Sequence, residues 1–148
     1  METIHAADEV RCTWASEPIR NGAVLVGRDR VGAVGTLEEL RARFPGARVR
    51  VWPGVLGPAR VHEGPLPDAP TPRERIHAVL KSGAVAVLAE YADTPELRAA
   101  AERNDVVVLP RTQTTAIVEV GRADLAVFDD DGECVATVCS GRLVHRRR

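Results

Sequence analysis

The stretch WPGVLGPARVHEGPLP, Trp52 to Pro67, marks the point where the chain changes character. Before it, short apolar runs alternate with turn residues, and after it the pattern predicts helix, strand, helix and strand. Six prolines lie between Pro53 and Pro72. Because proline fixes φ and lacks a backbone donor, we expect residues 54–72 to form an irregular connection.

Length and composition describe an ordinary globular domain. The chain has 148 residues, of which 45% are hydrophobic and 28% are charged, so one domain with a modest core is expected. Its net charge is −1 and only 3% of its residues are aromatic. With neither a basic field nor aromatic stacking platforms, we expect no binding of nucleic acid. No apolar run approaches the ~20 residues that cross a bilayer, so no membrane contact is expected.

The cysteine spacing and the N-terminal residues indicate in which cellular compartment the protein is expected. METIHAADEV has neither the basic nor the apolar part of a signal peptide, and no cysteine pair has the spacing CxxC. We therefore expect reduced thiols and a cytoplasmic protein. Cys134 and Cys139 are five residues apart, so on one regular strand they would face opposite sides as small core residues.

The front third of the chain is predicted to be rich in strands. Thr36 and Glu39 form a capping-box pattern, so a helix is expected from Leu37 to Phe44, where Pro45-Gly46 ends it. Asn21-Gly22 is a turn signal that precedes a hairpin. The strands expected here cover residues 3–7, 9–14, 23–27, 31–34 and 48–52.

The middle and last thirds differ in their patterns. Thr71 and Thr94 are each followed by proline, which predicts helix starts, and residues 84–89 and 106–109 are almost wholly apolar, as buried parallel strands are. This order predicts one right-handed parallel crossover. The last third is predicted to be a meander. Its expected strands cover residues 123–129, 134–139 and 143–145, and the acidic run Asp129 to Asp131 reads as a hairpin turn rather than a calcium loop.

The two ends together resemble one known family. The front segment, Ile19 to Leu56, reads IRNGAVLVGRDRVGAVGTLEELRARFPGARV…WPGVL, and the back segment, Val118 to Arg146, reads VEVGRADLAVFDDDGECVATVCSGRLVHR. Both resemble the terminal strands of metal-dependent amidohydrolases of the imidazolonepropionase-like group. The resemblance implies an α+β, mainly β fold, with a composite β-sandwich at residues 1–57 and 118–148 and a short α/β insert at residues 58–117. It also implies a structural, backbone-bonding role for Asp124.

The chain departs from this family between its two ends. Only 61 residues, 57–117, stand where the family has a (β/α)₈ barrel, and a barrel needs ~250 residues. The resemblance implies a His-x-His metal pair after the Pro-Gly run. Counting from Pro53, these positions fall on Ala59 and Val61, or on Gly64 and Leu66 if Gly57-Pro58 is an insertion. We therefore expect no metal site and no cofactor, unless a zinc site has been rebuilt around other residues.

Polar residues that follow apolar strands are the remaining site candidates, because α/β proteins bind ligands at the carboxyl ends of strands. The candidates for catalysis are His62, Glu63, Glu90 and Asp93. The candidates for ligand binding are Tyr91, Arg111, Thr112 and Gln113. Each of these residues is also explained by an ordinary polar loop or a helix cap.

Three functions stay open at this stage. The first is a non-catalytic relative that serves as an interaction or accessory domain, paired as a homodimer or with another protein, because a sandwich without its barrel exposes apolar surface. The second is a small hydrolase of C–N bonds with a rebuilt site around His62, Glu63 and Glu90. The third is a small-molecule binding module. A pocket that contains His62 would favour the second, and a pocket without a convergent base or nucleophile would favour the third.

Overall fold

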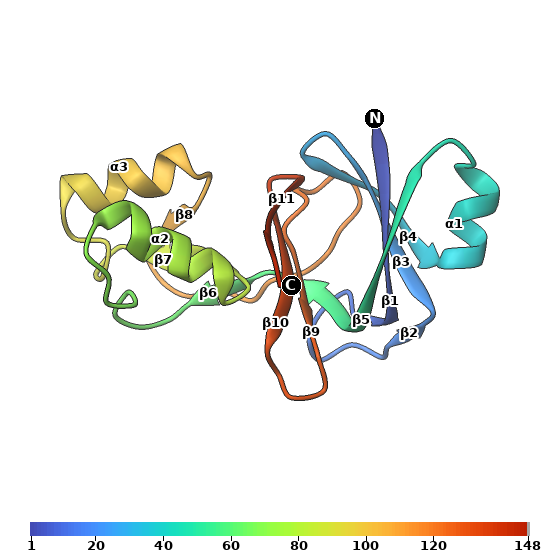
Figure 1. Cartoon of the computed structure of the whole chain (residues 1–148), viewed down its shortest axis with the longest axis horizontal. Coiled ribbons are helices and arrows are strands. Elements are labelled where there is room, and N and C mark those ends of the chain that lie inside the picture. The colour runs from blue at the N-terminus through green and yellow to red at the C-terminus, as the bar shows by residue number, and fades with distance from the viewer. Residues whose placement is uncertain (148) are drawn as a thin grey trace.

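The computed structural model describes residues 1–147, in which eleven strands and three helices form two lobes (Figure 1). The predicted α+β, mainly β class is confirmed. The β lobe comprises β1 (Glu2–Val10), β2 (Ile19–Arg20), β3 (Gly22–Gly27), β4 (Arg30–Thr36), α1 (Leu37–Arg43), β5 (Arg48–Pro58), β9 (Leu125–Phe128), β10 (Cys134–Cys139) and β11 (Arg142–Arg146). The insert comprises β6 (Arg60–His62), α2 (Pro72–Lys81), β7 (Ala84–Leu88), α3 (Pro95–Arg103) and β8 (Val107–Leu109).

The β lobe is one eight-stranded sheet that joins both ends of the chain. Its order is β11-β10-β9-β5-β1-β3-β4, with β2 paired to β1. All neighbours are antiparallel except β1 and β5, which are parallel. The sheet bends so that its front and back strands share one apolar cluster, in which Val24 and Val31 meet Leu125 and Val138. The expected sandwich is therefore built from a single sheet.

Helix α1 forms as the capping-box pattern predicts. Thr36 accepts a hydrogen bond from the Glu39 amide, and the Glu39 carboxylate accepts one from the Thr36 amide in return. The helix buries Leu40 completely against the sheet, in a cluster with Ile4 and Leu25.

The expectation of two separate strands at residues 3–7 and 9–14 is wrong. β1 runs from Glu2 to Val10 as one strand, because β5 pairs with it from Thr3 to Val10, while β3 pairs with residues 2–6 on its other side. The chain then turns, and the hydroxyls of Thr13 and Ser16 hydrogen-bond at 2.5 Å. This turn carries Trp14 toward the insert.

The expected irregular connection at residues 54–72 is also wrong in its first part. β5 continues through Pro53 to Pro58, where it pairs with β9. Pro53 and Gly54 lie where the β1–β5 register shifts, a bulge that tolerates proline in a strand. Gly54 has φ +95°, and a Cβ there would come within 2.1 Å of the Phe128 carbonyl oxygen. Glycine is therefore required where the two ends of the chain meet.

The insert has one strand more than predicted. β6 precedes α2, and the three strands form a parallel sheet in the order β6-β7-β8. Thr71 and Thr94 cap the two helices as expected, each accepting a hydrogen bond from an amide in the first turn. Both helices pack on one side of this sheet (Figure 1), and none of the helices within residues 1–147 is long and apolar enough to cross a membrane.

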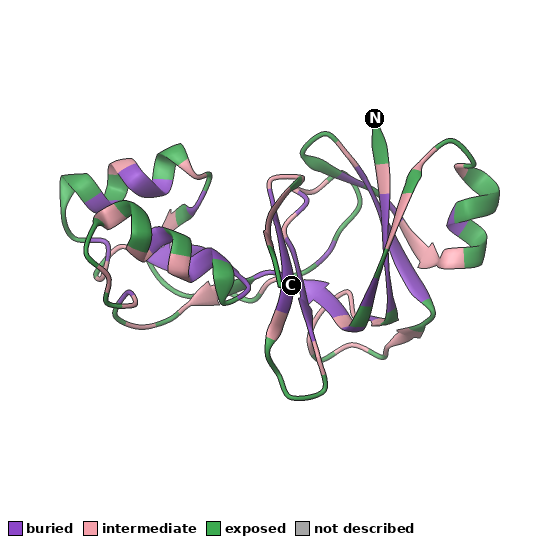
Figure 2. Ribbon diagram, viewed as in Figure 1, coloured by how far each residue is buried: buried purple, intermediate pink, exposed green. Residues whose placement is uncertain are grey.

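The two lobes share an apolar cluster. Ile76 and Leu80 of α2 and Val87 of β7 pack with Phe128 and Cys139 of the β lobe. The buried side of α2 continues toward the buried strands of the β lobe (Figure 2), where α2 contacts β10 and β11. The insert therefore depends on the outer face of β9 and β10 for part of its core.

The two cysteines of β10 do not face opposite sides, contrary to expectation. A bulge between Cys134 and Ala136 shifts the register with β9 by one residue. As a result, Cys134 and Cys139 both pack against the cluster shared with the insert, while Val135 and Val138 lie in the β-lobe core. A bulge of this kind moves a side chain to the other face of a strand.

Candidate functional site

The parallel register of the insert brings the sequence candidates to one edge. β6, β7 and β8 end at His62, Leu88 and Leu109, and all candidates belong to these ends or to the loops that follow them. One direct contact joins two of these loops, because the Thr112 hydroxyl donates a hydrogen bond to the Glu63 carboxylate.

His62 lies on the side of the sheet that the helices cover. It is in register with Val87, which packs against α2, whereas Val61 is in register with Ala86 on the opposite face. The His62 Nε2 atom is 2.9 Å from the carbonyl oxygen of Pro65. The imidazole is therefore held by its own loop and is separated by the sheet from the face that Val61 and Ala86 share.

Glu90, Tyr91 and Asp93 occupy the turn between β7 and α3. Glu90 and Asp93 are exposed, and Tyr91 is half-buried. The turn is stabilised by Arg98, whose Nε donates to the Ala92 carbonyl at 2.8 Å. Neither Glu90 nor Asp93 lines either of the two cavities described below.

The donor set does not fit the catalytic metal that the family resemblance implies. The expected ligand positions hold Ala59, which is buried, and Val61, and neither side chain has a donor atom for a metal. Among residues 1–147, no three His, Cys, Asp or Glu side chains gather closely enough to hold a metal ion.

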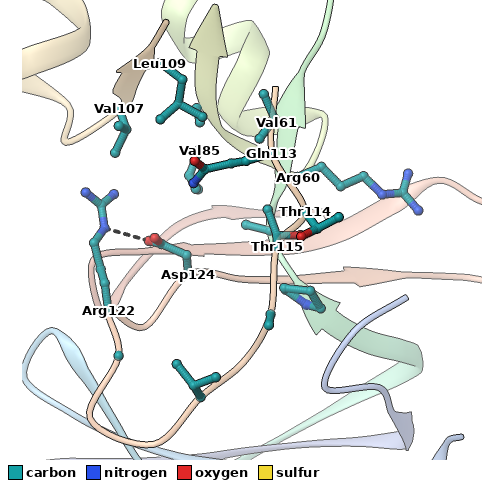
Figure 3. Close-up of a pocket in the computed structure, with 16 residues that line it drawn as sticks. Arg60, Val61, Val85, Val107, Leu109, Gln113, Thr114, Thr115, Arg122 and Asp124 are labelled. Carbon is teal, nitrogen blue, oxygen red and sulfur yellow. Dashed lines mark hydrogen bonds and ion pairs between the residues drawn. The ribbon is translucent and has the colours of Figure 1, made fainter. Parts of the chain in front are cut away.

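Two neighbouring cavities are both lined by the segment from Gln113 to Ala116, which returns from β8 toward the β lobe, and by Arg60 and Val61. The first, the sheet cavity, has a volume of about 320 Å³. Its walls are the face of the insert sheet that carries Val61 and Val107, the 113–116 segment, and the pair Arg122–Asp124 (Figure 3). The Gln113 side chain points into this cavity toward Val85, and Arg60 extends the other way (Figure 3).

The second, the Trp14 cavity, has a volume of about 620 Å³. It is lined by the turn from Thr13 to Ala15, by Arg60, Val61 and Glu63, and by the same 113–116 segment. Gln113 is thus the one candidate from the sequence that borders both cavities, and Glu63 borders the second.

The ion pair Arg122–Asp124 in the sheet cavity has a structural role. Arg122 Nε donates to Asp124 Oδ1 at 2.9 Å, and the same oxygen accepts from the Ser140 amide at 2.9 Å. The predicted backbone-bonding role of Asp124 is therefore confirmed. Arg122 also contacts the sulfur of Cys139 at 3.1 Å. Burial raises the pKa of this thiol to about 11, so it stays protonated at neutral pH and is a poor nucleophile.

Trp14 and Arg60 are the cavity residues that the sequence did not single out. Trp14 lies in the misassigned strand at residues 9–14, and Arg60 lies in the unrecognised strand β6. The Arg60 guanidinium carbon is 4.9 Å from the centre of the Trp14 ring. No local pattern links these residues, because they are 46 positions apart and meet through the parallel β1–β5 pairing, which brings the turn after β1 beside the end of β5 and hence beside β6.

A family comparison supports the resemblance of the β lobe. Residues 22–47 match the family model described as the imidazolonepropionase-like composite domain of bacteria. This segment contains β3, β4 and α1, so the predicted resemblance is confirmed for the front of the β lobe. No curated protein matches the chain.

Solved structures extend the likeness to the overall fold. An adenosine deaminase from Xanthomonas campestris with bound zinc is similar with a TM-score of 0.58 and 17% identity over 72% of this chain and 33% of that chain. A guanine deaminase from E. coli is similar with a TM-score of 0.54 and 14% identity over 73% of this chain and 35% of that chain. An aminofutalosine deaminase from Helicobacter pylori is similar with a TM-score of 0.53 and 16% identity over 73% of this chain and 32% of that chain. The chain therefore spans about a third of these deaminases and shares their fold over that part.

Proposed function

We propose that this chain is a non-catalytic relative of the amidohydrolases that serves in the cytoplasm as an interaction domain and forms a homodimer through the insert. The observation that carries the proposal is the face of the insert sheet turned away from the helices. Register places Val61, Ala86 and Val107 on this face, together with Leu88 and Leu109. In a closed barrel the face turned away from the helices is the interior, where branched apolar side chains of all the strands cover one another.

The chain itself covers this face only in part. The 113–116 segment crosses it, yet Val107 remains 37% exposed and Val118, which lines the same cavity, remains 56% exposed. Parallel sheets are normally buried on both faces, and exposed apolar surface of this kind favours association. A second copy of the chain would supply the missing cover.

The hydrolase alternative is less well supported by the geometry. His62 lies on the helix side of the sheet and Glu63 is engaged by Thr112, so a base and an acid do not converge on one open space. Elemental analysis of the untagged protein tests this alternative. We expect no stoichiometric metal, and one zinc per chain that is lost in His62→Ala would restore the hydrolase hypothesis.

Light scattering on the full chain tests the dimer. The chain mass is 16.0 kDa, so we expect a solution mass of about twice that value. The double variant Val107→Glu with Val118→Glu should be monomeric, because it places charge in the proposed interface. Val51→Glu is the matched control, since Val51 is 70% exposed on β5 in the other lobe. A monomeric wild-type protein would contradict the proposal.

A further inference from the structure

The Trp14 cavity contains an arginine whose position is fixed by aromatic rings. The Arg60 guanidinium carbon lies 4.0 Å from the centre of the Phe128 ring and 4.9 Å from that of Trp14. These two rings meet edge to face, with centres 5.5 Å apart. Contact with two ring faces restricts the guanidinium to one place, and such contacts are favourable in themselves. Arg60 is therefore held in place before any ligand arrives.

The charge of this arginine is not neutralised by the chain. None of the ion pairs within residues 1–147 involves Arg60, although its side chain is exposed at the cavity. Glu63 borders the same cavity, but its carboxylate accepts a hydrogen bond from Thr112. A guanidinium that is fixed and unpaired presents two parallel N–H donors, the arrangement that a carboxylate matches.

The remaining walls suit a flat apolar body. Val61, Ala15 and Ala116 provide apolar surface, and Thr114 and Thr115 provide hydroxyls. Trp14 is itself fixed, because its Nε1 donates to the Pro58 carbonyl at 2.9 Å. A Cβ at Gly57 would come within 2.6 Å of its ring, so the ring fits only above a glycine. The volume of about 620 Å³ lies within the ~300–1,000 Å³ range of small-molecule sites.

We propose that the Trp14 cavity binds a small carboxylic acid with a flat apolar body, whose carboxylate pairs with Arg60 and whose body lies along Trp14. The walls contain a single cation and one carboxylate, which favours a monoanion over a phosphate. This site adjoins the proposed dimer face, because both cavities are lined by Arg60, Val61 and residues 113–116, whereas Val107 and Val118 line the sheet cavity but not the Trp14 cavity.

The two tryptophans of the chain make a direct binding experiment possible. The indole N–H of Trp14 reports on the cavity, and that of Trp52, which donates to His5 inside the β lobe, is an internal reference. In ¹H–¹⁵N spectra, 2-naphthoate should shift the Trp14 signal in a saturable way and leave the Trp52 signal in place. The neutral analogue 2-naphthalenemethanol should bind with an affinity lower by a factor of about ten or more, because it lacks the negative charge.

Substitution of Arg60 tests whether its positive charge is needed for 2-naphthoate binding. Arg60→Gln should weaken 2-naphthoate binding about tenfold or more. Arg43→Gln is the matched control, because Arg43 also lies over an aromatic ring, that of Phe44, at 5.1 Å in the other lobe. Equal affinity for the two naphthalene probes, or unchanged binding in Arg60→Gln, would overturn the proposal.

A second pair of variants leaves Arg60 in place. Ala15 is exposed and lines the cavity, so Ala15→Glu adds a negative charge without removing a contact of the aromatic wall. Ala15→Glu should weaken 2-naphthoate binding relative to the isosteric Ala15→Gln, with an unchanged Trp52 signal as the sign of an intact β lobe. Identical binding by these two variants would also contradict an anion site.

Discussion

The two lobes solve the problem of sheet edges in different ways. In the β lobe, the outer strand β4 is continued by an isolated bridge from Arg30 to Arg122, and Gly141 packs so closely on the opposite turn that a Cβ would reach the Arg28 carbonyl. The sheet thus nearly closes on itself. In the insert, β6 and β8 are both edge strands of a three-stranded sheet. The insert therefore exposes the unpaired outer sides of two edge strands, which the nearly closed sheet of the β lobe largely avoids.

The lobes also differ in which residues form their apolar cores. The β lobe holds two apolar clusters made from its own residues, around Val24 and around Leu40. The single cluster of the insert includes Ala126, Phe128 and Cys139 from the β lobe. We infer that the β lobe is the stable scaffold and that the insert folds against it.

The largest effect is expected where the front and back of the chain meet. Gly54→Ala forces a residue with a side chain into φ +95° and against the Phe128 carbonyl. Backbone strain and overpacking together should lower the free energy of unfolding by about 4 kcal/mol, measured by urea denaturation. Gly46→Ala is the control, because nothing lies within 4 Å of a Cβ there. Similar losses in both variants would show that β5 and β9 are not critically packed at Gly54.

Acid should weaken the β lobe through His5. Burial, with a smaller effect of Arg50, lowers the pKa of this imidazole from 6.5 to about 4. Between pH 6.5 and pH 4 this imidazole is protonated in the unfolded chain but neutral in the folded chain. The free energy of unfolding is therefore highest above pH 6.5 and falls as the pH decreases toward 4. The loss should reach about 3 kcal/mol. Urea denaturation at a series of pH values measures it.

Matched histidine variants assign that acid effect. His5→Gln removes the titrating group but keeps an acceptor for Trp52, whose Nε1 donates to His5 Nδ1 at 3.2 Å, so the stability loss below pH 6.5 should shrink. His77→Gln changes an exposed histidine on α2, outside the β lobe, and should retain most of the stability loss that the wild type shows in acid. An equal acid response in His5→Gln would rule out His5 as the cause.

A smaller effect is expected at the junction of the lobes. The buried Thr137 hydroxyl of β10 donates to the Leu80 carbonyl of α2 at 2.8 Å. Thr137→Val should cost about 1.5 kcal/mol, because the carbonyl loses this partner, and Thr137→Ser should retain most of the stability. Hydrogen exchange should show greater loss of protection in α2 than in β1. Uniform loss in both would mean that the lobes unfold as one unit.

The smallest effect is expected within the insert alone. The Thr94 hydroxyl accepts a hydrogen bond from the Leu97 amide at 3.1 Å and caps α3. Thr94→Ala should lower stability by about 1 kcal/mol, and Thr94→Ser should be near neutral, as judged by thermal unfolding. A loss several times larger would indicate that α3 has a greater structural role than its cap alone provides.

The sequence predicted those features that depend on neighbouring residues. The helices begin at Thr36, Thr71 and Thr94 as their capping patterns indicate, and the hairpin that joins β9 and β10 follows the Asp-Asp-Gly turn. These are contacts between residues three or four positions apart. The family model matches residues 22–47, within the front segment for which the resemblance was stated, and this stretch contains β3, β4 and α1.

The candidate site was only partly predictable. The polar residues after the apolar strands do lie at one edge of a parallel sheet, as their positions indicated. The side on which His62 lies depends on its register with Val87, and the contact of Arg60 with Trp14 depends on two segments that the sequence did not identify as a strand and a turn.

By itself, the sequence determined the helices, their caps and the hairpins, because each rests on short-range hydrogen bonds and on the period of apolar residues. Only the tertiary structure decided that β5 continues past Pro53, that Cys134 turns toward the insert, and that Arg60, exposed at a cavity, forms no ion pair with any other of residues 1–147. The physical reason is the same in all three cases. Strand pairing and register join residues far apart in the chain, such as Leu56 and Val127, and a shift of one position moves a side chain to the other face.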